Sequence, residues 1–415
     1  MSVPTSFPQQ LGAAQGINDL YPADSILEQI VELARRNTDL PPSAVLSAAY
    51  SHLSAAFVRA GFTLSHGSTR SISPNLYILG VGQSGFDFES ALQDVVQVIL
   101  ASSKVHSSPA ALTSGALFAI CDHGKFLTGA DSGAASPSEL QARCTAYLIA
   151  MNSGEWLRHL HSTTGSETLR DYLIRGYGGG IFIQVKGTKL KETAPVHLVV
   201  FTSSQQTQFF TALGDHFYTS SLLRKFALVI ADDKPIRSQA FPSSDGFKDA
   251  ARRWASDWQE ILAGPQSYRF APEAVDMLER WWAKRIGQAG PADGSLRHYA
   301  ELVQKYGLIL QALIEPTGTV GPEAVTIAIS VAERHLHDLH VAQTELANEC
   351  EEQRLMRKVE EHMKKHLHAT RGDIMRQLRG VKTAVKMNAA LEAIMEMSTN
   401  DELRDRAREL RAAAR

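Results

Sequence analysis

The sequence has little cysteine, almost no net charge and no long apolar run, and each shortage excludes a class of protein. Its three cysteines, Cys121, Cys144 and Cys350, lie far apart without a C-x-x-C spacing. The wide separation of the three cysteines excludes a disulfide framework and a structural zinc site. A formal net charge of −2 excludes a uniformly basic nucleic-acid coat, so any such contact must be local. Because no stretch approaches the roughly 20 apolar residues of a membrane span, and no signal-like segment opens the chain, we expect a cytoplasmic protein without membrane contact.

The 415 residues, 44% of them hydrophobic, predict more than one folded region. Residues 1–21 lack periodicity and predict a flexible arm. Between 22 and 245 short apolar runs alternate with helical stretches such as SELQARCTAYLIAMNSGEWLRHL, which predicts an α/β core with a mainly parallel sheet. Long helical patterns predict a helical domain over 246–360, and 361–415 reads as a small basic tail of short helices.

A glycine-rich turn follows the apolar run at 76–79 and precedes an amphipathic helix. A phosphate-binding loop needs glycines that expose backbone N–H groups, a lysine and a hydroxyl. The residues that fit the nucleotide-binding role here are Gly82, Ser84, Gly85 and Ser90. The lysine is missing, because Phe88 stands in its place and Glu89 stands in place of the hydroxyl; a shift of one residue puts Glu89 in the lysine position.

An acid facing a triphosphate repels it, and the missing lysine removes a contact to the transferring phosphate. We therefore do not expect ordinary ATP hydrolysis. The favoured interpretation of the turn is a strand-to-helix connection without a ligand, so no cofactor is expected. Weak binding of ATP and magnesium without turnover is the alternative.

Polar residues near two apolar runs are candidates for the chemistry around a nucleotide. ALFAICDHG is predicted as a strand that ends at Asp122, an acid that could hold magnesium, with His123 where a general base would stand. A loop histidine without a role is the favoured alternative for His123. PVHLVVFTSSQQ is predicted to place Thr202, Ser203 and Gln205 at a strand end, as sensors of a γ-phosphate.

Arg224 immediately precedes the apolar run KFALVIADD. From the start of a strand an arginine can reach the nucleotide of a neighbouring subunit. The alternative is an ordinary surface ion pair.

This order of features resembles a domain of unknown function that follows primase domains in phage, plasmid and mobile-element replication proteins. The resemblance is carried by SPNLYILGVGQSG, ALFAICDHG, PVHLVVFTSSQQ and SSLLRKFALVIADD, and by the helical segments from residue 271. It covers most of 22–400 and implies a P-loop (RecA/AAA-like) core, a helical domain, a winged-helix-like tail and a ring-shaped homo-oligomer. The sequence departs from that pattern at Phe88 and Glu89. Primer synthesis would require a separate primase or replication partner.

One segment of the tail is densely basic. Between 364 and 388 a single acid, Asp373, accompanies seven cations, which are Lys364, Lys365, Arg371, Arg376, Arg379, Lys382 and Lys386. Thr370 is predicted to cap a helix over 371–378, and a second helix follows from about 383. This helix-turn-helix arrangement sets cations against DNA phosphates. The alternative is a solvated basic face.

The histidines at 335, 337 and 340 do not predict a metal site, because 335 and 337 lie on different sides of a helix. The sequence thus favours a DNA-binding, helicase- or primase-associated replication protein of a mobile element that does not hydrolyse ATP. Two alternatives stay open: an active DNA-dependent helicase-type ATPase with an atypical loop, and an inactive paralogue that serves as a subunit or regulator of a replication or defence complex.

Overall fold

The computed structural model describes residues 16–412, with gaps at 39, 67–69, 83–87, 104–106, 110–112, 127–144, 151–153, 162–165, 187–188, 194, 207, 210–219, 232–243, 290–294, 349–350, 367, 379–383 and 398–400. It divides into two compact units, Met1–His340 and Val341–Arg415. The sequence placed its last boundary at 360, inside a helix of the second unit. We describe each unit by itself.

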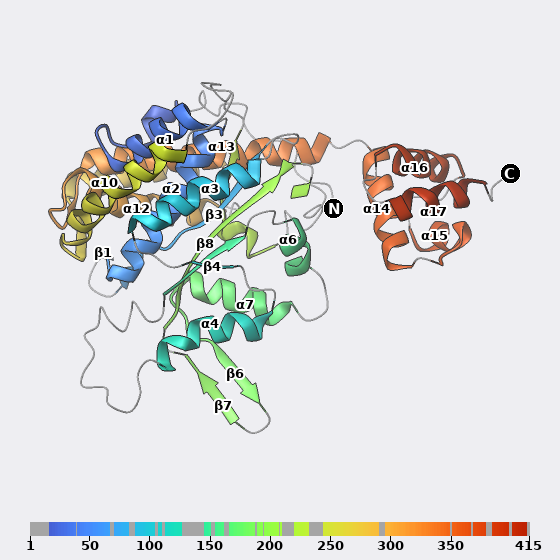
Figure 1. Ribbon diagram of the computed structural model, residues 1–415, viewed down its shortest axis with the longest axis horizontal. Coiled ribbons are helices and arrows are strands. Elements are labelled where there is room, and N and C mark those ends of the chain that lie inside the picture. The colour runs from blue at the N-terminus through green and yellow to red at the C-terminus, as the bar shows by residue number, and fades with distance from the viewer. Residues whose placement is uncertain are drawn as a thin grey trace. The chain divides into compact units, whose positions relative to one another are not determined.

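A five-stranded parallel sheet organises the first unit (Figure 1). Its order is β4-β5-β8-β3-β9, and every neighbouring pair is parallel. In chain order the strands are β3 (Tyr77–Gly82), β4 (Ser108–Pro109), β5 (Thr145–Ala150), β8 (His197–Gln205) and β9 (Ala227–Ala231). The mixed α/β class with a mainly parallel sheet is confirmed.

Helices cover both faces of this sheet, so β3 and nearly all of β8 are buried. On one face α2 (Pro42–Ala60) and α3 (Phe88–Ser103) share a core with Val199 and Phe201 of β8. On the other face lie α4 (Ser114–Phe126), α6 (Gly154–His161) and α7 (Glu167–Tyr177). A Cβ on Gly176 of α7 would lie 2.5 Å from Leu198, so glycine permits the close approach of α7 to β8.

Helix α2 is buried along almost its whole length, which fits a helix that is apolar on all sides. Around it pack α1 (Ile26–Asn37), α3, α10 (Ser244–Leu262) and α12 (Ser295–Ile314). Trp254 and Trp258 of α10 are fully buried in this core. The helices between 244 and 340 therefore share one core with the sheet, where the sequence suggested a separate helical domain.

A second, mixed sheet has the order β11-β10-β1-β2. Its strands are β1 (Thr63–His66), β2 (Arg70–Ile72), β10 (Ser267–Phe270) and β11 (Thr319–Val320). Helices α11 (Pro272–Ala289) and α12 connect β10 to β11, and α13 (Pro322–Asn348) follows. This sheet packs against α12 and links the end of α2 to the C-terminal helices of the unit.

The end of the predicted arm over 1–21 is folded. Residues Ile17–Leu20 form a 3-10 helix, η1, and both Leu20 and Tyr21 are buried. The Tyr50 hydroxyl donates a hydrogen bond to the Leu20 carbonyl, which ties this segment to α2. Residues 1–15 lie outside the described part of the chain.

Two secondary-structure predictions in the core are wrong. The apolar run ALFAICDHG belongs to helix α4, and the stretch expected to be helical from 138 contains strand β5 before α6. Leu117, Phe118 and Cys121 are buried and lie on one face of α4. A short apolar run fits a buried helix as well as a buried strand, so its pattern alone cannot separate them.

The second unit is a helical bundle in the residues described. It comprises α14 (Glu351–Lys365), α15 (Arg371–Gln377), α16 (Ala384–Met397) and α17 (Asp401–Ala412). Val359, Ile374, Leu391 and Leu403 lie in its core. No strand occurs among its described residues, so the wing of the expected winged-helix fold is not seen within them.

Candidate nucleotide and nucleic-acid sites

The carboxyl edge of the parallel sheet has a topological switch point between β3 and β8. After β3 the chain runs past β8 and β5 to β4, at one end of the sheet. After β8 it runs in the opposite direction, past β3, to β9 at the other end. Adjacent strands whose connections run in opposite directions open a crevice outside their carboxyl ends, where α/β sheets bind ligands. Gly82 and Gln205 pair in register at this point.

The predicted nucleotide-binding residues lie only partly within the described part of the chain. Gly82 is the last residue of β3 and is buried, and Ser90 lies in the first turn of α3 beside Phe88 and Glu89. Ser84 and Gly85 lie outside the described residues, as do the side chains at 88–90. The strand before the turn and the helix after it are therefore present as predicted.

Of the three predicted sensor residues, Gln205 alone lies at the edge. Thr202 and Ser203 are fully buried within β8, where they pair with Leu79 and Gly80 of β3. The Thr202 hydroxyl donates a 3.0 Å hydrogen bond to the Ala150 carbonyl, so it joins β8 to β5. Thr202 and Ser203 thus lie inside the strand rather than at its end, and Gln205 is half-buried at the switch point.

Asp122 and His123 do not end a strand. Both belong to α4, which packs against α7 and β5, and their side chains lie outside the described part. The strand that reaches this edge is β5, which ends at Ala150. Its sequence, TAYLIA, is rich in β-branched and aromatic residues, and that signal could have located it.

Arg224 lies at the opposite edge of the sheet. It belongs to η2 (Leu223–Lys225), is exposed, and precedes β9, whose first residue pairs with Ile78 of β3. Because the strands are parallel, Arg224 is at the amino edge while Gly82 is at the carboxyl edge. It therefore lies away from the glycine turn of its own chain, and a role toward a neighbouring subunit stays a prediction.

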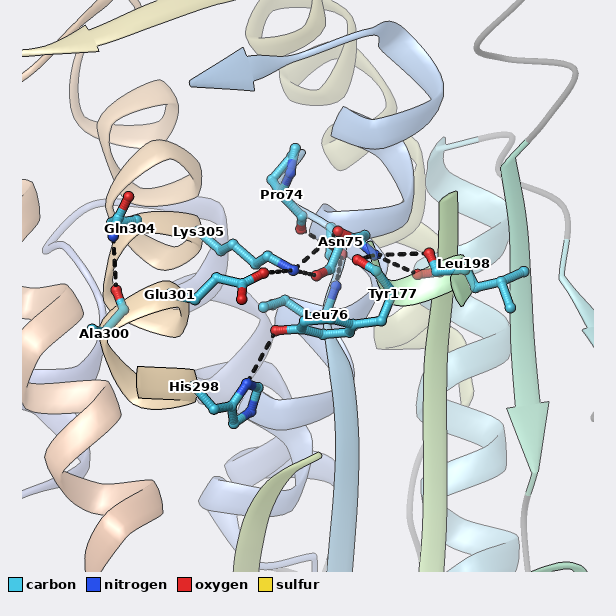
Figure 2. Close-up of polar contacts among 12 residues, drawn as sticks. Pro74, Asn75, Leu76, Tyr177, Leu198, His298, Ala300, Glu301, Gln304 and Lys305 are labelled. Carbon is cyan, nitrogen blue, oxygen red and sulfur yellow. Dashed lines mark hydrogen bonds and ion pairs between the residues drawn. The ribbon is translucent and has the colours of Figure 1, made fainter. Parts of the chain in front are cut away.

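The amino edge holds a buried polar cluster that the sequence did not predict (Figure 2). The Lys305 ammonium of α12 donates hydrogen bonds to the Asn75 carbonyl at 2.9 Å and to Asn75 Oδ1 at 3.1 Å. It also pairs with Glu301 at 3.1 Å and lies 3.5 Å from the centre of the Tyr177 ring. Lys305 is only 1% exposed, which makes this a desolvated charge held by nearby partners.

Asn75 extends this cluster to two further elements. Its amide nitrogen donates to the carbonyls of Tyr177 at 2.9 Å and Leu198 at 3.0 Å. The Tyr177 hydroxyl lies 3.4 Å from Nδ1 of His298, another buried residue of α12. Burial, followed by the charge of Lys305, holds the pKa of His298 well below its usual range. The cluster therefore ties α12 to the start of β3, the end of α7 and the start of β8.

Side chains of helix α13 hydrogen-bond to the outer edge of β9, where a sixth strand could otherwise pair. Asp338 accepts a 2.9 Å hydrogen bond from the Ile230 N–H, and Arg334 donates to the Ile230 carbonyl at 3.2 Å and to Asp338 at 3.0 Å. Edge strands left open invite pairing with other chains, so this cover protects the β9 edge of the sheet.

His335 completes the cover of β9. Its Nδ1 lies 3.0 Å from the Leu228 carbonyl, which can only accept, so Nδ1 carries the proton and Nε2 accepts from the Tyr306 hydroxyl at 2.9 Å. Burial lowers the pKa of His335 to about 4. His335 is thus a neutral structural residue, and no group of three metal-ligating side chains occurs among the described residues.

The predicted DNA-binding cations are divided among three helices of the second unit. Lys364 and Lys365 are exposed at the end of α14, and Arg371 and Arg376 lie on α15. Arg379 and Lys382 lie outside the described residues, and Lys386 lies in α16 with its side chain undescribed. The predicted Thr370 cap is confirmed as a capping box with Asp373.

Acidic neighbours offset part of this charge. Lys364 pairs with Glu360 at 3.0 Å, and Arg376 pairs with Asp373 at 2.8 Å. Arg371 donates a 2.7 Å hydrogen bond to Asn388 of α16. Exposed pairs of this kind are weak and exchange readily with other anions such as phosphates.

The fold and the switch point define a doubly wound α/β protein with a helical second unit. No family model and no curated protein matches the sequence. Among solved structures, a full-length MCM homologue from Methanopyrus kandleri is similar with a TM-score of 0.40 at 14% identity, covering 77% of this chain and 63% of that chain. A similarity at this level assigns neither a family nor an activity. Within the described part of the chain, no helix has the length and apolar character needed to cross a bilayer.

Proposed function

We propose that this chain is a DNA-binding protein of the replication type. It is built on a P-loop-like sheet, and it does not hydrolyse ATP. The observation that carries the proposal is the glycine-rich turn at the switch point, between Gly82 and α3, in a sequence that has Phe88 and Glu89 in place of the lysine and hydroxyl. A ligand crevice without its phosphate-binding cation favours a scaffold over an enzyme.

The ATPase half of the proposal is tested by turnover with and without DNA. We expect the purified chain to hydrolyse ATP no faster than a buffer control. The variant carrying Phe88→Lys and Glu89→Ser is expected to gain binding of a fluorescent ATP analogue, because it restores the cation and the hydroxyl. Turnover stimulated by DNA in the unaltered chain would contradict the proposal, and a double variant without binding would show that the turn is no phosphate loop.

The DNA half is tested in the second unit. Changing Arg371, Arg376 and Lys365 to Gln is expected to weaken binding of duplex DNA, with a less steep dependence on salt, because fewer counterions are released. The matched control changes Arg404, Arg408 and Lys358 to Gln in the same unit. Equal binding by the two triple variants would show that the 364–388 segment is not the DNA site.

Assembly as a homo-oligomer also belongs to the proposal. It is supported by the position of Arg224 at the exposed start of β9. Sedimentation at micromolar concentration is expected to show an oligomer that Arg224→Ala weakens. A monomer would contradict this part.

A further inference from the structure

A two-stranded ribbon extends from the α4 and α7 side of the sheet (Figure 1). It consists of the antiparallel strands β6 (Ile183–Lys186) and β7 (Lys189–Glu192). Its root is firmly held, because Phe182 stacks on Tyr172 of α7 with ring centres 4.5 Å apart and exchanges hydrogen bonds with Thr193. The Tyr172 hydroxyl also donates to the Ile183 carbonyl. The ribbon is thus an anchored projection.

The register gives the ribbon two chemically different faces. Directly opposed residues share a face, so Ile183, Val185, Leu190 and Glu192 lie on one side. Gln184, Lys186, Lys189 and Lys191 occupy register positions on the other. The register therefore assigns mainly apolar residue types to one face and three lysines to the other.

The described apolar side chains at the ribbon are exposed. Of the four large hydrophobic residues that are exposed in the described part, three lie at the ribbon: Ile181 at 41%, Ile183 at 39% and Leu190 at 62%. Beside them an open hollow of about 600 Å³ is lined by Arg175, Gly180, Ile183 and Glu192 among others. Exposed apolar residues gathered on one projection mark an interaction surface.

We propose that this ribbon enters the major groove of duplex DNA. Strands roughly 5 Å apart form a ribbon that a groove about 12 Å wide admits. Three lysines against one acid between 183 and 192 suit a polyanion, and aliphatic side chains suit the thymine methyl groups of the groove. The ribbon has no aromatic residue on which unpaired bases could stack, which favours the duplex over a single strand. The inference rests on the proposed DNA binding, and it places a second DNA-binding surface outside the tail.

The test measures the affinity of the full chain for a labelled duplex of about 30 base pairs and for its single strand over a salt series. The variant carrying K186Q, K189Q and K191Q is expected to bind the duplex about tenfold more weakly at low salt. Its slope of log K against log salt should fall by about 2 to 3, because each phosphate that the protein no longer neutralises lowers the slope by about 0.9. The matched control carries R280Q, K284Q and R297Q, three exposed cations on α11 and α12.

A second variant, Leu190→Gln, measures the contribution of the apolar face to duplex binding separately from that of the lysines. Because this side chain is mostly exposed, its removal leaves the fold intact, and we expect a few-fold weaker duplex binding with the salt slope unchanged. The proposal is overturned if the lysine variant binds duplex like the control, or if the full chain prefers the single strand. If the tail variant loses all binding while the lysine variant loses none, the ribbon proposal fails and the proposed function stands; if the unaltered chain binds no DNA, both fail.

Discussion

The two edges of the five-stranded sheet are built in opposite ways. At the amino edge, Lys305 and Asn75 join four elements through buried hydrogen bonds. At the carboxyl edge, β3 and β8 end at Gly82 and Gln205, and the buried Arg334–Asp338 pair of α13 holds Ile230 near the end of β9. The described networks thus differ in reach: the one at the amino edge joins four elements, whereas the one near the carboxyl edge joins β9 to α13.

The largest loss of folding stability is expected from Lys305→Met. The change leaves the Asn75 carbonyl and Oδ1 without their shared donor, and it leaves Glu301 without its cation. Removing one partner of a buried charged network costs about 3–5 kcal/mol of folding free energy. Urea unfolding monitored by circular dichroism measures this, with the exposed Lys284→Met as the matched control. A change no larger than the control's would show that the cluster does not stabilise the amino edge.

The next effect is a loss of stability in acid. Burial lowers the pKa of His335 to about 4, and that of His197, at the start of β8, also to about 4. The unfolded chain protonates these residues near pH 6.5 and the folded chain does not, so stability is full above about pH 6.5 and falls toward pH 4. Each pKa unit is worth about 1.4 kcal/mol, hence on the order of 3 kcal/mol for His335.

Unfolding midpoints in urea at pH 7, 5.5 and 4.5 test this pH dependence. His335→Gln should be less stable than the unaltered chain at pH 7 and should lose less stability in acid. An equal pH dependence in both proteins would assign the acid sensitivity to other groups.

Asp338→Asn is expected to cost about 2–3 kcal/mol, because it removes the buried ion pair with Arg334 while the side chain keeps its shape. Asp249→Asn, which breaks an exposed pair with Arg252, is the control and should change stability by less than about 0.5 kcal/mol. Hydrogen exchange of the Ile230 amide would localise the loss to β9. Unchanged exchange there would contradict a role in covering the edge.

The smallest effect on stability is expected from Gln205→Ala at the carboxyl edge, within about 0.5 kcal/mol. Its effect should appear instead in ligand binding, once Phe88→Lys and Glu89→Ser have restored a phosphate loop. Nucleotide titration of that variant with and without Gln205→Ala makes the measurement. A large loss of stability, with binding untouched, would reverse the contrast between the two edges.

The sequence predicted what depends on local pattern. The strand before the glycine turn, the helix after it and the capping role of Thr370 are all present. It did not separate α4 from a strand, because an apolar run of this length is compatible with both.

The amino-edge cluster could not be found from sequence for another reason. Asn75 and Lys305 are 230 residues apart, and each is an ordinary polar residue until the fold buries it. The same holds for Thr202, whose hydroxyl looks like a sensor in sequence and is occupied by the Ala150 carbonyl in the structure. Hydrogen bonds between residues that are far apart in the sequence decide these roles.

The central position of β3 has a consequence for synthesis on the ribosome. This strand emerges early, yet its neighbours β8 and β9 begin at residues 197 and 227. At about 5–20 residues per second, both edges of a fully apolar strand stay unpaired for roughly 6–25 seconds. The nascent chain is therefore a natural client for chaperones that bind extended apolar segments, and pausing before residue 197 would lengthen its exposure to aggregation.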